Sequence, residues 1–266
     1  MCILLTVKSA SARFRNWLFR TAFLEVTLPA HSHRTWPLVC AEAAGPLYVL
    51  VGATEMLFRQ GFDIRRHALS LLANGDWGWV HSLMMVTTGL LTLAGAFGIH
   101  RVLRGTAGGS WGPALLSIYG LGLVGAGFFS ADPALGFPPG TPLKGNPVSS
   151  HGIMHFVCGG IGFVGLIAAC LVFRWRFARA KERAWSAFSG VTGVAFFAAF
   201  FGIAALSQKS AATRAAVNIL FSFAVVLAWI WLSALAHRLK SAFLTEQPGE
   251  TPRVTEKVLA GTDLGA

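Results

Sequence analysis

HGIMHFVCGGIGFVGLIAACLVF, residues 151–173, contains no Asp, Glu, Lys or Arg. A helix needs about 20 mostly apolar residues to cross a bilayer, and this segment is long enough. Its apolar run is continuous and does not alternate with polar residues, which favours a helix over a barrel strand. The ten residues that follow, RWRFARAKER (174–183), contain five Lys or Arg. This part of the chain therefore predicts a membrane-spanning helix followed by a basic loop.

Five further segments have the same character. The composition agrees with them, because 54% of the 266 residues are hydrophobic and only 12% are charged. An ordinary soluble domain has about 25% charged residues, so a soluble globular protein, a disordered chain and a disulfide-stapled secreted module are excluded. The predicted fold is an all-α polytopic membrane protein, a six-helix transmembrane bundle. The other predicted spans are residues 38–58, 80–99, 113–131, 185–206 and 215–236.

The basic residues predict an orientation, because cytoplasmic loops of membrane proteins are enriched in Lys and Arg. With the N-terminus inside, the outer segments hold six of the 22 Lys and Arg, and the inner segments hold the other 16. We therefore expect both termini to be cytoplasmic, in a multi-pass protein of the cell membrane. The net charge of +11 lies mostly at the ends of apolar runs. The lipid bilayer, and not nucleic acid, is therefore the expected partner. The six outer residues are Arg59, Arg65, Arg66, Lys144, Lys209 and Arg214.

Three regions are expected along the chain: a basic N-terminal extension (1–36), a six-span membrane domain (37–240) and a polar C-terminal tail (241–266). In the extension, basic residues interleave with aromatic ones, as in a helix lying on an anionic leaflet. A disordered extension, or a start codon assigned too far upstream, explains the same pattern. The tail is mostly polar and contains two prolines near its start, which predicts disorder.

Polar side chains gather in three segments of the predicted outer side, residues 59–79, 130–142 and 149–155. His151 and His155 lie four apart at a helix start, so their Cβ atoms are expected about 5–6 Å apart on one face. Two neutral imidazoles at this spacing suit zinc, which makes zinc the candidate cofactor. Two ligands do not complete a site, and the candidates for the others are Asp132 and His81.

Other interpretations of these residues stay open. Asp132 can accept a hydrogen bond from His151 or His155 in a polar site without a metal. The histidines can also lie at the level of the lipid headgroups, bonded to water or backbone. An Asp before a proline is equally typical of a turn in which the carboxylate bonds nearby backbone. Ser149 or Ser150 can cap the helix that follows.

The remaining charges near the spans have simple explanations. Glu42 and Glu55 lie near the ends of the first span, so reaching to the membrane edge is enough to account for them. Arg65 and Arg66 can hold a lipid phosphate or be solvated loop charges. No acidic residue lies near the middle of any span, which disfavours a proton-coupled transporter. Glycines crowd the third and fourth spans, and in each span one of them lies four residues before an alanine, the small-xxx-small spacing that predicts close helix packing.

Three stretches occur in a fixed order: RQGFDIRRHALSLLANGDWGW (59–79), ADPALGFPPGTP (131–142) and SHGIMH (150–155). Together they resemble the domain-of-unknown-function 998 family of multi-pass membrane proteins, over about residues 39–236. The resemblance implies a six-span membrane protein without an established activity, and it transfers no catalytic residues. His81 departs from the family's pattern, since other members often carry an uncharged polar residue there. The positions that match the motifs are Asp63, Arg66, His67, Ser70, Asp132, His151 and His155, of which the first four are the candidate ligand-binding residues.

Two functions are compatible with these features. The first is an integral membrane protein of uncharacterised activity that binds a lipid or another small ligand at a polar site on its outer face. The alternative is a membrane-embedded, metal-dependent lipid hydrolase, in which zinc would lower the pKa of a bound water and make it a nucleophile. The sequence contains no complete catalytic set, so it leaves open whether the protein is an enzyme.

Overall fold

The computed structural model describes residues 32–144 and 146–245. All regular structure in these residues is helical, and six helices are long and apolar enough to cross a membrane. The predicted all-α, six-helix, multi-pass membrane fold is confirmed. The elements are α2 (Ser32–Phe58), the short 3₁₀ helix η1 (Leu69–Ala73), α3 (Gly78–Leu103), α4 (Trp111–Phe128), α5 (Ser150–Arg179), α6 (Arg183–Leu206) and α7 (Ala211–Thr245).

The helix boundaries differ from the prediction where charged residues lie close to apolar ones. α5 continues to Arg179, so the predicted basic loop over residues 174–183 is wrong and most of it is helix. Aromatic residues alternate with the arginines there, and arginine stems can lie along a helix while their charged ends reach the membrane edge. α4 ends at Phe128, before the predicted end at residue 131, because the residue before Pro133 is biased away from helical geometry.

The first and last long helices extend beyond the predicted boundaries of the membrane domain. α2 begins inside the predicted N-terminal extension, and α7 runs to Thr245, into the start of the predicted polar tail. The rest of the extension and of the tail lies outside the described residues, so the predictions for those two regions stay predictions.

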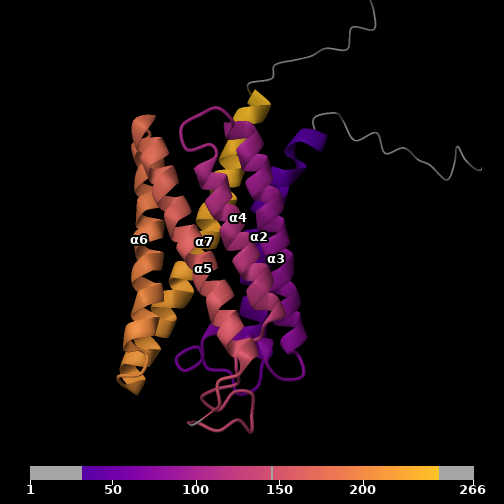
Figure 1. The fold of residues 1–266 in the computed structure, drawn as a ribbon, viewed down its shortest axis with the longest axis vertical. Helices are drawn as coiled ribbons and strands as arrows, with labels where there is room; N and C mark the ends of the chain where they lie inside the picture. The colour runs from indigo at the N-terminus through magenta and orange to yellow at the C-terminus, as the bar shows by residue number, and fades with distance from the viewer. Residues whose placement is uncertain (1–31, 145, 246–266) are drawn as a thin grey trace, which may run out of the picture. The chain divides into compact units, whose positions relative to one another are not determined.

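The six long helices run alongside one another as a bundle (Figure 1), and their contacts arrange them as a ring in chain order. Each helix packs against the next one along the chain, and α7 returns to pack against α2. A Cβ on Gly95 of α3 would lie 2.4 Å from the Cβ of Ala41 on α2, and a Cβ on Gly45 of α2 would lie 2.4 Å from Ser233 Oγ on α7. At both contacts only glycine lets the helices approach this closely.

The predicted close packing of the glycine-rich spans is confirmed at the contact of α4 with α5. A Cβ on Gly122 would lie 2.6 Å from the Cα of Gly162 and 2.7 Å from the carbonyl oxygen of Cys158. Small residues at such crossings let backbones come together, which is how helices associate in lipid without a hydrophobic driving force.

Aromatic side chains fill the middle of the ring. Trp229 and Trp231 of α7 are both almost fully buried. Trp229 packs against the rings of Tyr48 and Tyr119, at centroid distances of 5.1 and 5.7 Å. The indole N–H of Trp231 donates to Ser189 Oγ at 3.0 Å, which satisfies a buried polar group inside the bundle.

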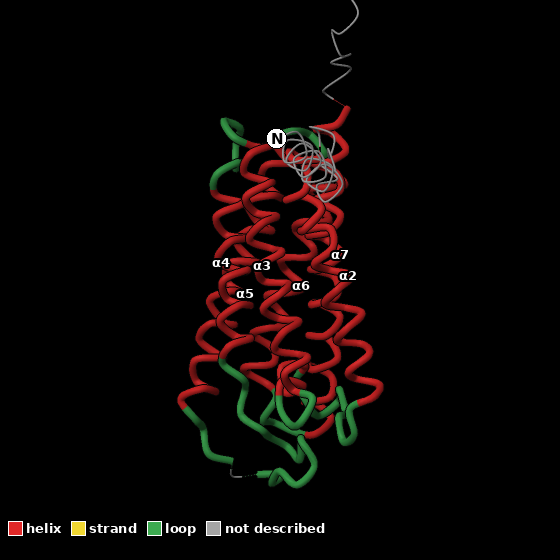
Figure 2. The backbone as a smooth tube through the Cα atoms, turned by 90° about the vertical axis from the view of Figure 1, so that its right-hand side faces the viewer, coloured by secondary structure: helices red, strands yellow, loops and turns green. Residues whose placement is uncertain are grey.

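The two ends of the bundle differ (Figures 1 and 2). The long-loop end, at the bottom of both views, carries the connections over residues 59–77 and 129–149. The terminal end carries the start of α2, the end of α7 and two short connections. Glu42 accepts from His237 at 2.9 Å and from Lys240 there, and Arg238 pairs with Glu182. The polar segments singled out in the sequence all lie at the long-loop end. That this end faces outward stays a prediction.

Candidate functional site

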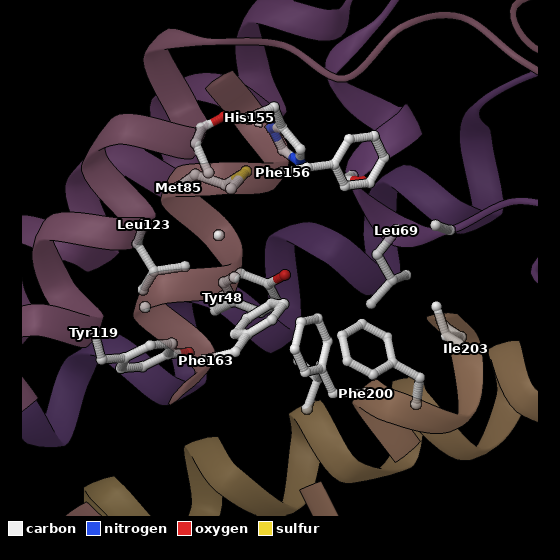
Figure 3. A pocket seen from close by; sticks show the side chains of 18 of the residues that line it. Tyr48, Leu69, Met85, Tyr119, Leu123, His155, Phe156, Phe163, Phe200 and Ile203 are labelled. Atoms are coloured by element: carbon white, nitrogen blue, oxygen red, sulfur yellow. Dashed lines mark hydrogen bonds between the residues drawn. The ribbon is translucent and has the colours of Figure 1, made fainter. Parts of the chain in front are cut away.

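A cavity of about 120 Å³ lies inside the ring near the long-loop end. All six long helices and η1 contribute to its walls, which are mainly aliphatic and aromatic (Figure 3). The labelled side chains around it come from segments far apart in the sequence: Tyr48, Leu69, Met85, Tyr119, Leu123, His155, Phe156, Phe163, Phe200 and Ile203. The polar side chains that join them are Ser70 and His81. The cavity is therefore an apolar space with a few polar groups on its wall.

His81, on the cavity wall, forms a buried polar pair with Glu55. Glu55 Oε2 lies 2.7 Å from His81 Nδ1, and the two side chains are 7% and 1% exposed. The expectation that Glu55 reaches the membrane edge is wrong, because this carboxylate points into the bundle. Glu55 can be buried because His81 is its partner, since a buried carboxylate is tolerated only when it is paired and hydrogen-bonded.

Arg59, the residue directly after the end of α2, completes this group. Its guanidinium lies 3.6 Å from Glu55 Oε1 and supplies the counter-charge for that carboxylate. In the tautomer in which Nδ1–H donates to the Glu55 carboxylate, the lone pair of His81 lies on Nε2. In the described part of the chain, neither His81 Nε2 nor Glu55 Oε1 has a hydrogen-bond partner, and both atoms are buried. His81 lines the cavity, and a buried imidazole nitrogen without a partner calls for a hydrogen-bonding group that the described residues do not supply.

His155 brings a second imidazole to the same cavity. Its Nδ1 lies 2.9 Å from the carbonyl oxygen of Ala126 and 2.7 Å from that of Phe129. Carbonyl oxygens only accept, so Nδ1 carries the proton, and in the neutral ring Nε2 is the acceptor. His81 and His155 thus share one arrangement: an oxygen fixes Nδ1, and Nε2 is left for another group.

Arg59 also fixes the segment that covers the cavity. It donates to the carbonyl oxygen of Leu72 at 2.9 Å and to that of Asn74, and it lies over the ring of Phe137. These bonds hold η1 on the end of the bundle, and the first turn of η1 presents Ser70 to the cavity. The position of Ser70 therefore depends on a residue that is ion-paired with the buried carboxylate.

His67 joins the two long connections. Its Nδ1 accepts from the backbone N–H of Asp63 at 2.9 Å, and its Nε2 donates to the carbonyl oxygen of Leu135 at 3.1 Å. The side chain is buried, with its ring 5.4 Å from that of Phe137. Burial lowers the pKa of His67 from its usual value, although the contact with Leu135 opposes the shift. A neutral imidazole is what this geometry requires, because a proton on Nδ1 would remove the acceptor for Asp63.

We expect the contact between the two connections to weaken in acid. A histidine whose pKa is lowered by folding contributes stability that is fully present above its unfolded pKa of about 6.5 and is lost as the pH falls below that value. Hydrogen exchange, corrected for intrinsic rates, should show less protection of the Asp63 amide at about pH 5.5 than at about pH 7.5. His67→Gln should remove this difference. Equal protection at both pH values in the native chain would contradict the assignment.

Asp132 bonds the residue that caps α5. Its carboxylate accepts from the backbone N–H of Ser149 at 2.8 Å and from the Ser149 hydroxyl, which in turn accepts from the N–H of Gly152. These bonds lower the pKa of the Asp132 carboxyl. A Cβ on Gly152 would lie 2.1 Å from Asp132 Oδ2, so the carboxylate sits directly against the start of α5. The prediction that Ser149 caps this helix is confirmed. The hydrogen bond considered between Asp132 and His151 or His155 is wrong, because Ser149 is its partner.

Each of the four candidate metal ligands contacts a different partner. His81 is paired with Glu55, His155 bonds backbone carbonyls, Asp132 bonds Ser149, and His151 is exposed with its ring against Phe129. Within residues 32–144 and 146–245, three or more His, Cys, Asp or Glu side chains do not come together as a possible metal site. His81 and His155 line the same cavity, and the other two candidates do not.

Of the four candidate ligand-binding residues, one lines the cavity and three do not. Ser70 lines the cavity, whereas His67 ties loops together. Asp63 accepts the N–H of Arg65 in its own turn, and Arg66 is an exposed loop residue. The structure therefore brings together Ser70, His81 and His155, and places the others outside the cavity.

The segments that form the bundle and its cavity match the profile of a known protein family. The profile of a family described as protein of unknown function (DUF998) matches residues 43–238. The chain belongs to the DUF998 family. In this DUF998 protein the match includes all the residues of the cavity wall. A search of curated proteins and a search of solved structures each returned no match.

Two residues of the site were missed in the sequence. Glu55 was assigned to the membrane edge, and Arg59 was counted only as an outer basic residue. The signal that could have found them is their i, i+4 spacing across the end of α2, which pairs a carboxylate with a guanidinium and so makes a buried position tolerable.

Proposed function

We propose that this DUF998 protein binds an amphipathic ligand with a free hydroxyl group in the cavity near its long-loop end. The apolar part of the ligand lies among the aromatic side chains, and the hydroxyl donates to His81 Nε2. The observation that carries the proposal is this nitrogen itself: it is buried and lacks a partner among the described residues, and the histidine that bears it lines an apolar cavity. Ligand sites of this kind are mostly apolar with a few polar groups that fix orientation.

The size of the cavity limits what it can enclose. An engineered cavity of about 150 Å³ holds one benzene molecule, so about 120 Å³ accommodates only the end of a longer amphiphile. The rest of the ligand has a way out beside α5. A Cβ on Gly159 would meet nothing within 4 Å, and the neighbouring Phe156 is 66% exposed. We therefore expect a long-chain alcohol or a glycerolipid with a free hydroxyl, entering from the lipid phase in the outer half of the bilayer.

Thermal unfolding of the full chain in lipid nanodiscs tests this proposal. Hexadecanol should raise the unfolding temperature in a saturable way, because a ligand that binds the native state stabilises it. Its methyl ether has the same chain but no hydroxyl hydrogen, so it should give little shift. Gly159→Leu, which places a side chain in the open space beside the cavity, should abolish the response. Gly202→Leu is the matched control, since its Cβ also meets nothing within 4 Å and it does not line the cavity.

Two results would overturn the proposal: equal shifts from the alcohol and the ether, or an unchanged response in Gly159→Leu. The metal content of the same preparation tests the alternative, a zinc-dependent lipid hydrolase. What supports that alternative is the pair of imidazoles whose Nδ1 atoms are fixed by oxygen, as in carboxylate–histidine–zinc arrangements. About one zinc per chain, lost in a His81→Gln/His155→Gln variant, would favour the hydrolase over the binding protein.

A further inference from the structure

A second concave surface lies at the terminal end of the bundle, on the outside of α5 and α6, away from the cavity discussed above. It is an open groove of about 1000 Å³. Its upper part is lined by basic residues at the ends of the two helices, and its lower part by small and branched apolar residues of α6. Charged and apolar surfaces thus follow one another along the helix axis.

The basic residues of the groove are Arg174, Lys181 and Arg183. Among the described residues, none of the three has a carboxylate within 4 Å, whereas nearby Arg238 pairs with Glu182. Charges in this position repel one another and attract an anion. Guanidinium groups bind phosphate through two parallel hydrogen bonds, which a lone ammonium group does not provide.

The backbone of α6 makes room for one of these residues. The Cδ atom of Arg174, on α5, lies 2.8 Å from where a Cβ on Gly190 would be. The hydroxyl of Ser186 donates to the carbonyl oxygen of Arg174 at 3.1 Å, which holds the two helices together at this level. The Arg174 side chain therefore crosses from its own helix over α6 into the groove.

Below the basic residues the groove is apolar. Val191 and Val194 of α6 are 61% and 57% exposed, and small alanine and glycine residues lie beside them. Residues 187, 190 or 191, and 194 or 195 follow one another by about one helical turn, or 5.4 Å. The apolar part of the groove thus runs along the helix, in the direction that an acyl chain takes in a bilayer.

We propose that this groove binds an anionic phospholipid, with its phosphate at Arg174, Lys181 and Arg183 and an acyl chain along α6. The order of the surfaces, basic at the helix ends and apolar below, matches the order of phosphate and acyl chain in the lipid. Basic pockets between transmembrane helices on the cytoplasmic side are typical of such sites. The groove shares no residue with the cavity near the long-loop end, so this site does not depend on the function proposed there.

Native mass spectrometry of the detergent-purified full chain tests the site. Phosphatidylglycerol should be retained in preference to phosphatidylcholine with the same acyl chains. Arg174→Gln/Arg183→Gln should weaken retention of phosphatidylglycerol by about tenfold or more, since each basic residue near an anionic surface contributes favourably. Arg101→Gln/Arg104→Gln removes the same charge near the same end, from residues outside the groove, and should leave retention nearly unchanged.

Two outcomes would overturn the proposal. Equal retention of the two lipids would show that the phosphate-bearing headgroup is not selected by its charge. Equal loss in the two double variants would show that net charge, and not this groove, attracts the lipid. Thermal unfolding of both variants in the same detergent verifies that they are folded.

Discussion

Replacing His81 by leucine is expected to lower the free energy of unfolding by about 3–5 kcal/mol, because it leaves the Glu55 carboxylate buried without its hydrogen-bonded partner. The carboxylate is 7% exposed, so water cannot replace the imidazole without opening the bundle. Arg59 stays within 3.6 Å but does not form a hydrogen bond with the carboxylate at that distance. Unfolding in mixed micelles titrated with dodecyl sulfate measures the change.

A double substitution distinguishes a lost partner from lost packing. Glu55→Leu/His81→Leu removes both polar groups and should be more stable than His81→Leu alone, since an apolar pair often replaces a buried ion pair at little cost. Ser82→Ala, on the next residue, is the control for general sensitivity of this helix. A loss below about 0.5 kcal/mol in His81→Leu would put the change in the range of ordinary surface substitutions and contradict the buried pair.

The second large effect is expected at the crossing of α4 with α5. Gly122→Ala places a methyl group 2.6 Å from the Cα of Gly162, where backbone and not a flexible side chain must move. Overpacking of this kind costs about 1–3 kcal/mol. Gly159→Ala, on the facing helix, meets nothing within 4 Å, and there alanine should stabilise by up to about 1 kcal/mol through its helix propensity. If the two variants had equal stability, the close crossing would be contradicted.

The six spans could be predicted because their signal is local. Each is a long apolar run, and a backbone in lipid has to satisfy its own hydrogen bonds by forming a helix. The ends were harder to predict. α5 continues through Arg174 and Arg176 to Arg179, because long basic side chains can reach the membrane edge from within a helix, and charge alone does not end one.

The site was predicted only in part, for a physical reason. Ser70, His81 and His155 were all singled out, and all three line the cavity. Their partners were not, because spans that are apolar on every side give no sign of which face turns inward. His151 and His155 illustrate this: they share a helical face, yet His151 is exposed and His155 is buried against the end of α4.

The pairing of Glu55 with His81 shows the same limit. The two residues are separated by 26 positions and belong to different helices. Their contact follows from the packing of α2 on α3, where small residues such as Gly95 set the distance. Residue spacing along one helix cannot report such a contact, although the cost of a buried carboxylate could have suggested that Glu55 has a partner.

The cavity near the long-loop end is proposed to take up a hydroxyl-bearing amphiphile. Photo-crosslinking of the full chain in membranes with a diazirine-bearing hexadecanol, mapped by mass spectrometry, tests it directly. We expect labelling of cavity residues such as Phe163 and Phe200, and excess hexadecanol should prevent this labelling, whereas its methyl ether should not. Labelling confined to exposed residues such as Phe128 and Phe197, unaffected by either competitor, would contradict it.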